Sequence, residues 1–122
     1  MDGPLGQHII ADLYGVDEEH LKDVPLLTDC LLNAANRCLL TPIGQPVVHV
    51  FPGGGLTGFL LLSESHISLH TYPEHHFIGI DLFSCGKGDP MNAIGVFRSA
   101  LSPNRESISV VARGNELNPN SV

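Results

Sequence analysis

The chain has 122 residues, of which 43% are apolar, and its six basic and thirteen acidic residues give a formal charge of −7. This length predicts one domain that can bury a sizeable core. The acidic balance argues against nucleic acid as a partner, because nucleic-acid binding needs basic patches. No stretch approaches the roughly 20 apolar residues of a membrane span. No secretory leader is expected, and three cysteines without C-x-x-C spacing favour reduced thiols in the cytoplasm.

Hydrophobic periodicity divides the chain into strands and helices. Apolar residues recur at helical spacing between Asp17 and Cys38, and acidic residues occupy the first turn, where the helix dipole favours them. Pro25 suits a first helical turn, and Asp89-Pro90 predicts the start of a second helix. We expect strands at 7–14, 47–51, 59–70, 77–83 and 107–112, with helices at 17–38 and 89–101.

The resulting order is β-α-β-β-β-α-β. Strands outnumber helices and the central strands are joined by short turns, which predicts an α+β two-layer sandwich with an antiparallel sheet and two helices on one face. We expect a single domain over residues 1–114 and a disordered tail at 115–122, which is polar and contains a proline. Cys30 and Cys38 fall on or near the apolar stripe of the first helix and are interpreted as small core residues.

The stretch from Leu60 to His76 holds more reactive side chains than any other part of the sequence. Hydroxyls, a carboxylate and imidazoles occupy positions where a structural strand would carry β-branched or aromatic residues. This pattern indicates either chemistry near the end of a strand or a hairpin with one polar face. The reactive residues are Ser63, Glu64, Ser65, His66, Ser68 and His70.

Pairing of 59–70 with 77–85 about the Tyr72–His75 turn places residues whose numbers sum to about 147 opposite each other. Cys85 then lies opposite Leu62, and Ser65 lies opposite Leu82. Cys85 is therefore expected within about 10 Å of the Glu64–Ser65 bond, as a candidate acid or nucleophile.

Three chemistries compete for these residues. A hydrolytic site could use Ser63 or Ser65 with His66 or His70, but no G-x-S-x-G turn is present. A metal site could form from the histidines and Glu74, but no H-E-x-x-H motif is present. The third is self-cleavage at Glu64–Ser65, which periodicity alone cannot establish. The candidate metal ligands are His66, His70, Glu74, His75 and His76.

The glycine-rich run Pro52–Gly58 lacks the order and the Lys-Ser/Thr ending of a phosphate loop, and it leads into a strand. Its expected role is the close approach of backbone to a ligand or to a neighbouring strand.

Several segments together resemble one known family. Residues 62–74, Leu-Ser-Glu-Ser-His-Ile-Ser-Leu-His-Thr-Tyr-Pro-Glu, resemble the processing motif of prokaryotic S-adenosylmethionine decarboxylases. Residues 6–15 and 81–86 are similar to the family's opening strand and to its cysteine-containing segment. The resemblance extends to about Gly114, and the Ser-Glu-Ser-His core followed by Cys85 is its most specific part.

The resemblance implies a proenzyme. Ser65 would attack the Glu64 carbonyl and form an ester, and β-elimination would leave a pyruvoyl group at position 65 and two chains, 1–64 and 65–122. The pyruvoyl group would be the cofactor, forming a Schiff base with the substrate amine.

The family's other functional residues map onto single positions of this chain. Thr57 and His70 match residues that assist processing, and Cys85 matches the residue that protonates the substrate carbon. Glu74 matches a ligand of the ribose hydroxyls. On a straight strand Ser65 and His70 have opposite parity, so processing by His70 requires a bulge, a twist or a different geometry at the new chain end.

Phe51 and Tyr72 match positions near the adenine, which favours S-adenosylmethionine as substrate. The resemblance implies that the product is an aminopropyl donor for spermidine. It also implies a homodimer with sites near its interface. The chain departs from the family's usual pattern at Tyr72, Ile78, Gly79 and 51–55, all expected near the nucleoside pocket. Arginine or ornithine as substrate, or a relative that binds a ligand without cleaving, are the alternatives.

Overall fold

The computed structural model describes residues 4–85 and 88–114. The predicted tail, 115–122, lies outside the described residues. Within them the elements are β1 (Gly6–Tyr14), the 3-10 turn η1 (His20–Lys22), α1 (Val24–Arg37), β2 (Val47–Val50), β3 (Leu56–Leu62), β4 (Ser65–Tyr72), the 3-10 turn η2 (Pro73–His75), β5 (Phe77–Ser84), α2 (Met91–Leu101) and β6 (Arg105–Arg113).

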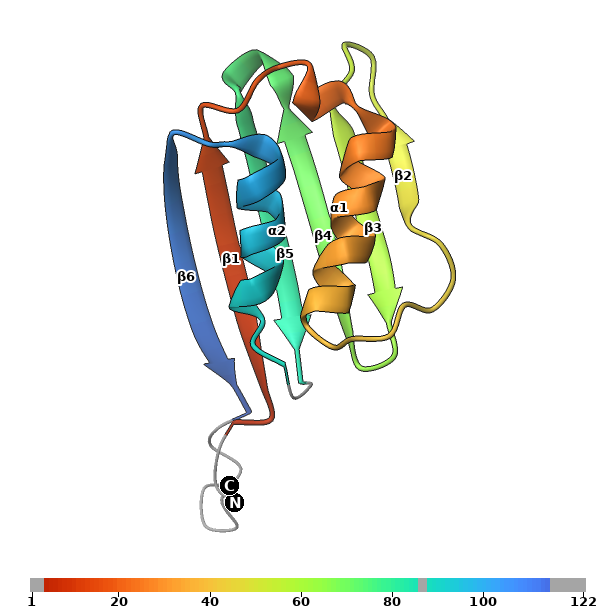
Figure 1. Ribbon diagram of the computed structural model, residues 1–122, viewed down its shortest axis with the longest axis vertical. Coiled ribbons are helices and arrows are strands. Elements are labelled where there is room, and N and C mark those ends of the chain that lie inside the picture. The colour runs from red at the N-terminus through yellow and green to blue at the C-terminus, as the bar shows by residue number, and fades with distance from the viewer. Residues whose placement is uncertain (1–3, 86–87, 115–122) are drawn as a thin grey trace.

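These strands form one antiparallel sheet of six strands in the order β2-β3-β4-β5-β1-β6. Both α-helices cover the same face of the sheet and pack against each other (Figure 1). The predicted α+β sandwich is therefore confirmed. Neither helix in the described part of the chain is long and apolar enough to cross a membrane.

The predicted single strand at 59–70 is wrong, because it is two strands joined by a turn. Ser63 and Glu64 form that turn, and Leu62 pairs with Ser65 directly across it. Two-residue hairpins are usually marked by glycine or asparagine, because the favoured turn types need a positive φ. Neither Ser63 nor Glu64 has a positive φ, so the turn carries no such signal in the sequence.

The predicted register between 59–70 and 77–85 is displaced by two residues. The pair is His66 with Phe83, and Leu82 lies opposite Ile67 instead of Ser65. The cause is the connection between β4 and β5, where η2 is followed by His76 in the left-handed region at φ 53°. A shift of two residues preserves side-chain alternation between β4 and β5. The turn between β3 and β4 does change it, because Leu62 and Ser65 share the buried face, whereas one continuous strand would place them on opposite faces.

The core lies between the helices and the inner face of the sheet. Asp23 caps α1 by accepting a hydrogen bond from the Leu26 amide at 3.0 Å, with Pro25 in the first turn. The helix therefore begins at Val24, next to the Pro25 candidate start, and not at Asp17. The fully buried side chains include Ile9, Leu13, Leu27, Leu31, Leu60, Ile67, Ile78 and Phe97.

Cys30 and Cys38 are buried in this core, as predicted, whereas Cys85 is exposed. Burial, with nearby carboxylates, raises the pKa of the Cys30 thiol to about 11. Burial also raises the pKa of Cys38, whose thiol donates to the Asp89 carbonyl at 3.5 Å. Both thiols are therefore unreactive structural groups.

The opposite face of the sheet carries no helix in the described chain. Its residues alternate with the core residues along each strand and are partly apolar. We call this the open face. Its exposed apolar side chains include Ile10, Val47, Phe59, Leu61, Tyr72 and Val111.

Candidate active site

The Glu64–Ser65 peptide lies in the β3–β4 turn at one end of the sheet. The Cys85 thiol, just beyond the end of β5, donates a hydrogen bond to the Glu64 carbonyl oxygen at 2.7 Å. The expectation that Cys85 lies near this bond is confirmed by the contact. A donor on that oxygen polarises the carbonyl toward nucleophilic attack.

Ser65 supplies an unengaged nucleophile beside this carbonyl. Its side chain is 8% exposed, and its hydroxyl has no hydrogen-bond partner among the described residues. Buried hydroxyls are normally paired, so an orphaned one next to a polarised peptide indicates a reactive position. The hydroxyl bonds to no described histidine, which removes support for a Ser-His hydrolase.

His70 and Thr57 are brought together, but far from Ser65. Thr57 Oγ1 and His70 Nδ1 are 3.1 Å apart on the open face. Pairing of β4 with β3 and β5 runs in unbroken register, so no bulge turns His70 toward the Glu64–Ser65 bond. The side chains of Ser65 and His70 lie on opposite faces of the sheet, and the two residues are about 17 Å apart along β4.

A cleft of about 660 Å³ opens beside His70 and Thr57. Phe51, Tyr72 and Glu74 line it, so the three predicted substrate-binding residues share one cavity. Phe51 and Tyr72 are about half exposed, at 48% and 47%. We call this cavity the aromatic cleft.

The glycine-rich run forms one wall of the aromatic cleft. Gly53 and Gly54 have φ values of 93° and 98°, a region that favours glycine. A Cβ at Gly55 would come within 3.0 Å of the Thr71 carbonyl oxygen, so the backbone of this run approaches β4 closely. The predicted role of the run in close backbone approach is confirmed at Gly55.

Two lining residues were missed by the sequence analysis. Thr71 is buried, and its hydroxyl accepts from the Leu56 amide at 2.9 Å and donates to the Leu21 carbonyl at 2.8 Å. Glu18, from the segment before η1, also lines the cleft. Strand alternation could have identified Thr71 as an inward hydroxyl in need of partners, but no pattern links Glu18 to β4.

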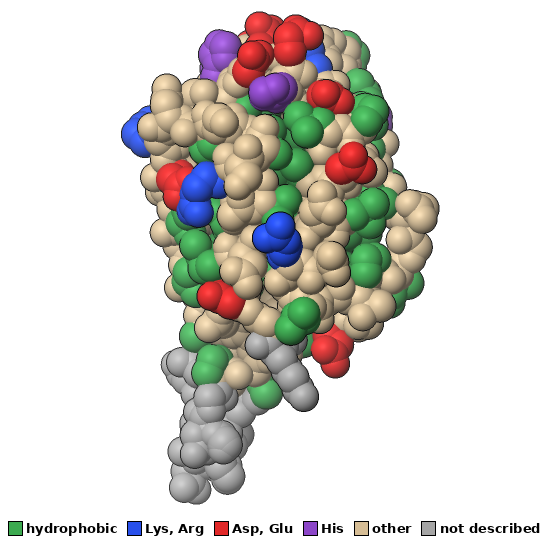
Figure 2. Space-filling view, in the orientation of Figure 1, with side chains coloured by type: hydrophobic (Ala, Val, Ile, Leu, Met, Phe, Trp, Pro, Cys, Tyr) green, Lys and Arg blue, Asp and Glu red, His purple; other side chains and the backbone are tan. Residues whose placement is uncertain are grey.

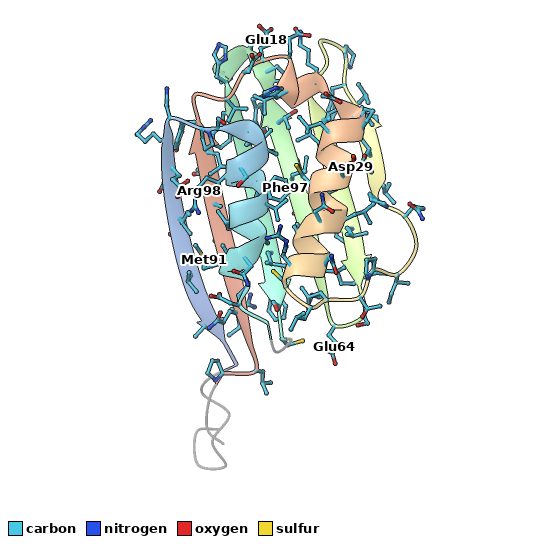
Figure 3. The ribbon with its side chains drawn as sticks, in the orientation of Figure 1. Glu18, Asp29, Glu64, Met91, Phe97 and Arg98 are labelled. Carbon is cyan, nitrogen blue, oxygen red and sulfur yellow. The ribbon has the colours of Figure 1, made fainter. Side chains whose placement is uncertain are left out.

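The predicted site residues thus fall at two ends of the molecule. Figure 3 shows Glu18 at one end and Glu64 at the other. A second, smaller cleft of about 410 Å³ lies beside Cys85, with Gln7 and Asp89 among its lining residues. Within one chain, the cleavage site and the aromatic cleft are separate.

Two positions where the chain departs from the family's pattern lie side by side on β5 but face opposite sides of the sheet. Ile78 is fully buried in the core, and Gly79 faces the open side next to Phe77 and Asp12. Neither residue lines the aromatic cleft. β-Strand alternation points Ile78 toward the helices, whereas Gly79 pairs with His70, which does line the cleft.

The alternative metal site has no structural support. In the part of the chain that the structure describes, no three His, Cys, Asp or Glu side chains gather as metal ligands would. His66 instead stacks between Phe59 and Phe83, with ring centroids 5.8 and 6.2 Å away. His76 contacts the Val16 carbonyl through Nδ1 at 3.0 Å.

Comparisons with known proteins agree on one family. A family model described as S-adenosylmethionine decarboxylase matches residues 7–114. An S-adenosylmethionine decarboxylase proenzyme of Sulfurihydrogenibium sp. (strain YO3AOP1) is 41% identical over 118 residues, covering 93% of this chain and 86% of the relative. One from Methanococcus vannielii is 38% identical over 111 residues and covers 90% of each chain.

A solved structure has the same fold. The crystal structure of the adenosylmethionine decarboxylase from Aquifex aeolicus VF5 superposes with a TM-score of 0.84 at 36% identity. The match covers 92% of each chain. The likeness therefore extends to the sheet and both helices.

Proposed function

The chain belongs to the S-adenosylmethionine decarboxylase family, and we propose that it is a proenzyme that cleaves itself between Glu64 and Ser65 and then decarboxylates S-adenosylmethionine. The observation that carries the proposal is the Cys85 hydrogen bond to the Glu64 carbonyl beside the unpartnered Ser65 hydroxyl. The product is the aminopropyl donor for spermidine synthesis. All three cysteines are free, which is consistent with the cytoplasmic location that we expect.

Self-cleavage begins at the turn. The Ser65 hydroxyl attacks the Glu64 carbonyl carbon, and the Cys85 thiol donates to the oxygen on which negative charge develops. The peptide C–N bond breaks as the Glu64 acyl group moves to the serine oxygen. β-Elimination of that ester releases the Glu64 carboxylate as the end of chain 1–64 and leaves a dehydroalanine at the start of chain 65–122. Water then adds to this residue and ammonia leaves, which gives a pyruvoyl group at position 65.

The residues around position 65 fit such a group. The Ser65 side chain is buried, so the group would be shielded from bulk water. When formed, the pyruvoyl carbonyl supplies an electron acceptor for decarboxylation. The exposed Cys85 thiol lies beside this position and delivers the proton to the substrate carbon that has lost carbon dioxide.

The aromatic cleft binds the nucleoside part of the substrate. Phe51 and Tyr72 offer ring faces to a flat base and to an adjacent sulfonium. Glu74 accepts hydrogen bonds from the ribose hydroxyls. No lysine or arginine is among the described residues that line the cleft, which suits a cationic substrate.

The separation of the two ends supports a homodimer with shared sites. A twofold axis through the open face, with the strands of the two copies running in opposite directions, places His70 and the aromatic cleft of one copy over the Glu64–Ser65 turn of the other. The scissile peptide lies in a turn at the end of the sheet, so the alternation of side chains along β4 does not prevent His70 of the other copy from approaching it. The exposed apolar side chains of the open face would be buried by the same contact.

Substrate identity is tested by offering carboxyl-labelled S-adenosylmethionine, arginine and ornithine to the purified protein. We expect labelled carbon dioxide from S-adenosylmethionine alone. Release from arginine or ornithine instead would establish the amino acid decarboxylase alternative. An intact chain with no release would establish a ligand-binding relative.

A further inference from the structure

A second carboxylate stands at the mouth of the aromatic cleft. Glu18 lines this cavity together with Glu74, although it comes from the segment between β1 and η1. Figure 2 shows acidic side chains gathered at this end of the molecule, where Figure 1 places that segment. The prediction that this acidic segment forms the first turn of the helix is wrong, because α1 begins at Val24.

Hydrogen bonds on both sides of Glu18 hold it in place. Before it, the Val16 amide donates to the His76 carbonyl at 3.0 Å, and the His76 ring contacts the Val16 carbonyl. After it, the Leu21 carbonyl accepts the hydrogen bond from the buried Thr71 hydroxyl. The segment is therefore fixed to the β4–β5 end of the sheet, and its carboxylate is presented to the cleft.

Lys22 partly neutralises this carboxylate. Its Nζ lies 3.4 Å from Glu18 Oε2. Both side chains are partly exposed, Lys22 at 35% and Glu18 at 48%. The Lys22 stem packs on the glycine-rich wall, because a Cβ added at Gly54 would lie 2.9 Å from its Cδ. Glu18 thus has an internal counter-ion at the edge of the cleft, and a cationic ligand would compete with it.

We propose that Glu18 is a specificity-determining residue that recognises the positive charge of a sulfonium nucleoside in the aromatic cleft, in competition with Lys22. The inference rests on the proposed function and adds a charge-selecting group to its cleft. A neutral thioether nucleoside has the same base and ribose without the charge. Glu18 therefore favours the sulfonium form and leaves the thioether form unaffected.

The test compares Glu18→Gln with Lys22→Met, because the two variants break the same ion pair but change the charge in opposite directions. Glutamine keeps the length of the Glu18 side chain, and methionine keeps the unbranched shape of Lys22 without its terminal ammonium group. We expect Glu18→Gln to raise KM for S-adenosylmethionine by about three- to tenfold and Lys22→Met to lower it, as one partly exposed charge near a ligand would do. The inhibition constant of 5′-methylthioadenosine should stay unchanged in both, and kcat should stay close to that of the wild type.

Glu19→Gln is the matched control, since it removes the same charge from a neighbour that does not line the cleft. If KM for S-adenosylmethionine changes in the same direction in Glu18→Gln and Lys22→Met, the ion pair has a merely structural role and the inference is overturned. An equal loss of methylthioadenosine binding would also overturn it. Wild-type protein that binds no S-adenosylmethionine would overturn the proposed function as well, whereas normal wild-type kinetics with an unchanged Glu18→Gln variant would overturn this inference alone.

Discussion

The separation of His70 from Ser65 predicts that cleavage occurs between partners. The two residues lie about 17 Å apart along one strand and on opposite faces, well beyond hydrogen-bond reach. A His70→Ala chain should therefore cleave poorly by itself, and a Ser65→Ala chain should not cleave. Produced together, they should complement each other, because the Ser65 of the first chain meets the intact His70 of the second.

The fraction of His70→Ala chains that should be cleaved follows from random pairing of the two variants into dimers. In an equal mixture, about half of the His70→Ala chains have a Ser65→Ala partner, and only these receive a histidine. Co-expression of the two chains with different tags, followed by denaturing electrophoresis and intact mass, measures the cleaved fraction. About half of the His70→Ala chains should appear as two fragments, and all Ser65→Ala chains should stay intact.

Two outcomes would refute this reasoning. Normal cleavage of the His70→Ala chain alone would remove His70 from processing. Absence of any rescue in the mixture would place the processing histidine on the same chain as the bond. His75→Ala serves as the control, because His75 is exposed in η2 and does not line the aromatic cleft.

Three further predictions concern single positions. Cys85→Ala should slow self-cleavage by about tenfold or more in a time course, because the Glu64 carbonyl loses its donor, while Cys85→Ser should retain part of the rate; an unchanged rate would contradict the contact. In uncleaved Ser65→Ala protein, Thr71→Val should lower the free energy of unfolding, measured in urea, by about 2–4 kcal/mol, because two buried backbone groups lose their hydrogen-bond partner. A loss no larger than that caused by Thr71→Ser would argue against both hydrogen bonds. Burial raises the pKa of Cys30 to about 11, so iodoacetamide at neutral pH should modify Cys85 in that uncleaved protein and spare the two buried thiols, as peptide mapping would detect.

The fold class was predictable because each element carries a strong periodic signal. The stripe of α1 and the alternation along β1 and β5 appear in the sequence as they do in the structure. The Ser63–Glu64 turn was not predictable, since its residues carry no turn signal and apolar strands flank it. Prediction of the β4–β5 register failed for a related reason, because the 3-10 turn and the left-handed His76 move the centre of the connection one residue further along the chain than the predicted Tyr72–His75 turn.

The site was predictable only in part, because its residues come together through long-range pairing. The Cys85–Glu64 contact follows from hairpin geometry, and a register error of two residues still left it in range. The position of Glu18 depends on how a connector folds back over β4, which local sequence does not encode. The distance between His70 and Ser65 became clear only when the strand proved regular.

Self-cleavage at Glu64–Ser65 is the central claim, and the intact mass of the purified protein, with N-terminal analysis of its smaller fragment, tests it most directly. We expect two chains corresponding to residues 1–64 and 65–122. The second should resist Edman degradation and be lighter, by one ammonia, than a fragment that begins with serine. A single chain with the full mass, or a smaller fragment with a free serine at position 65, would contradict the account.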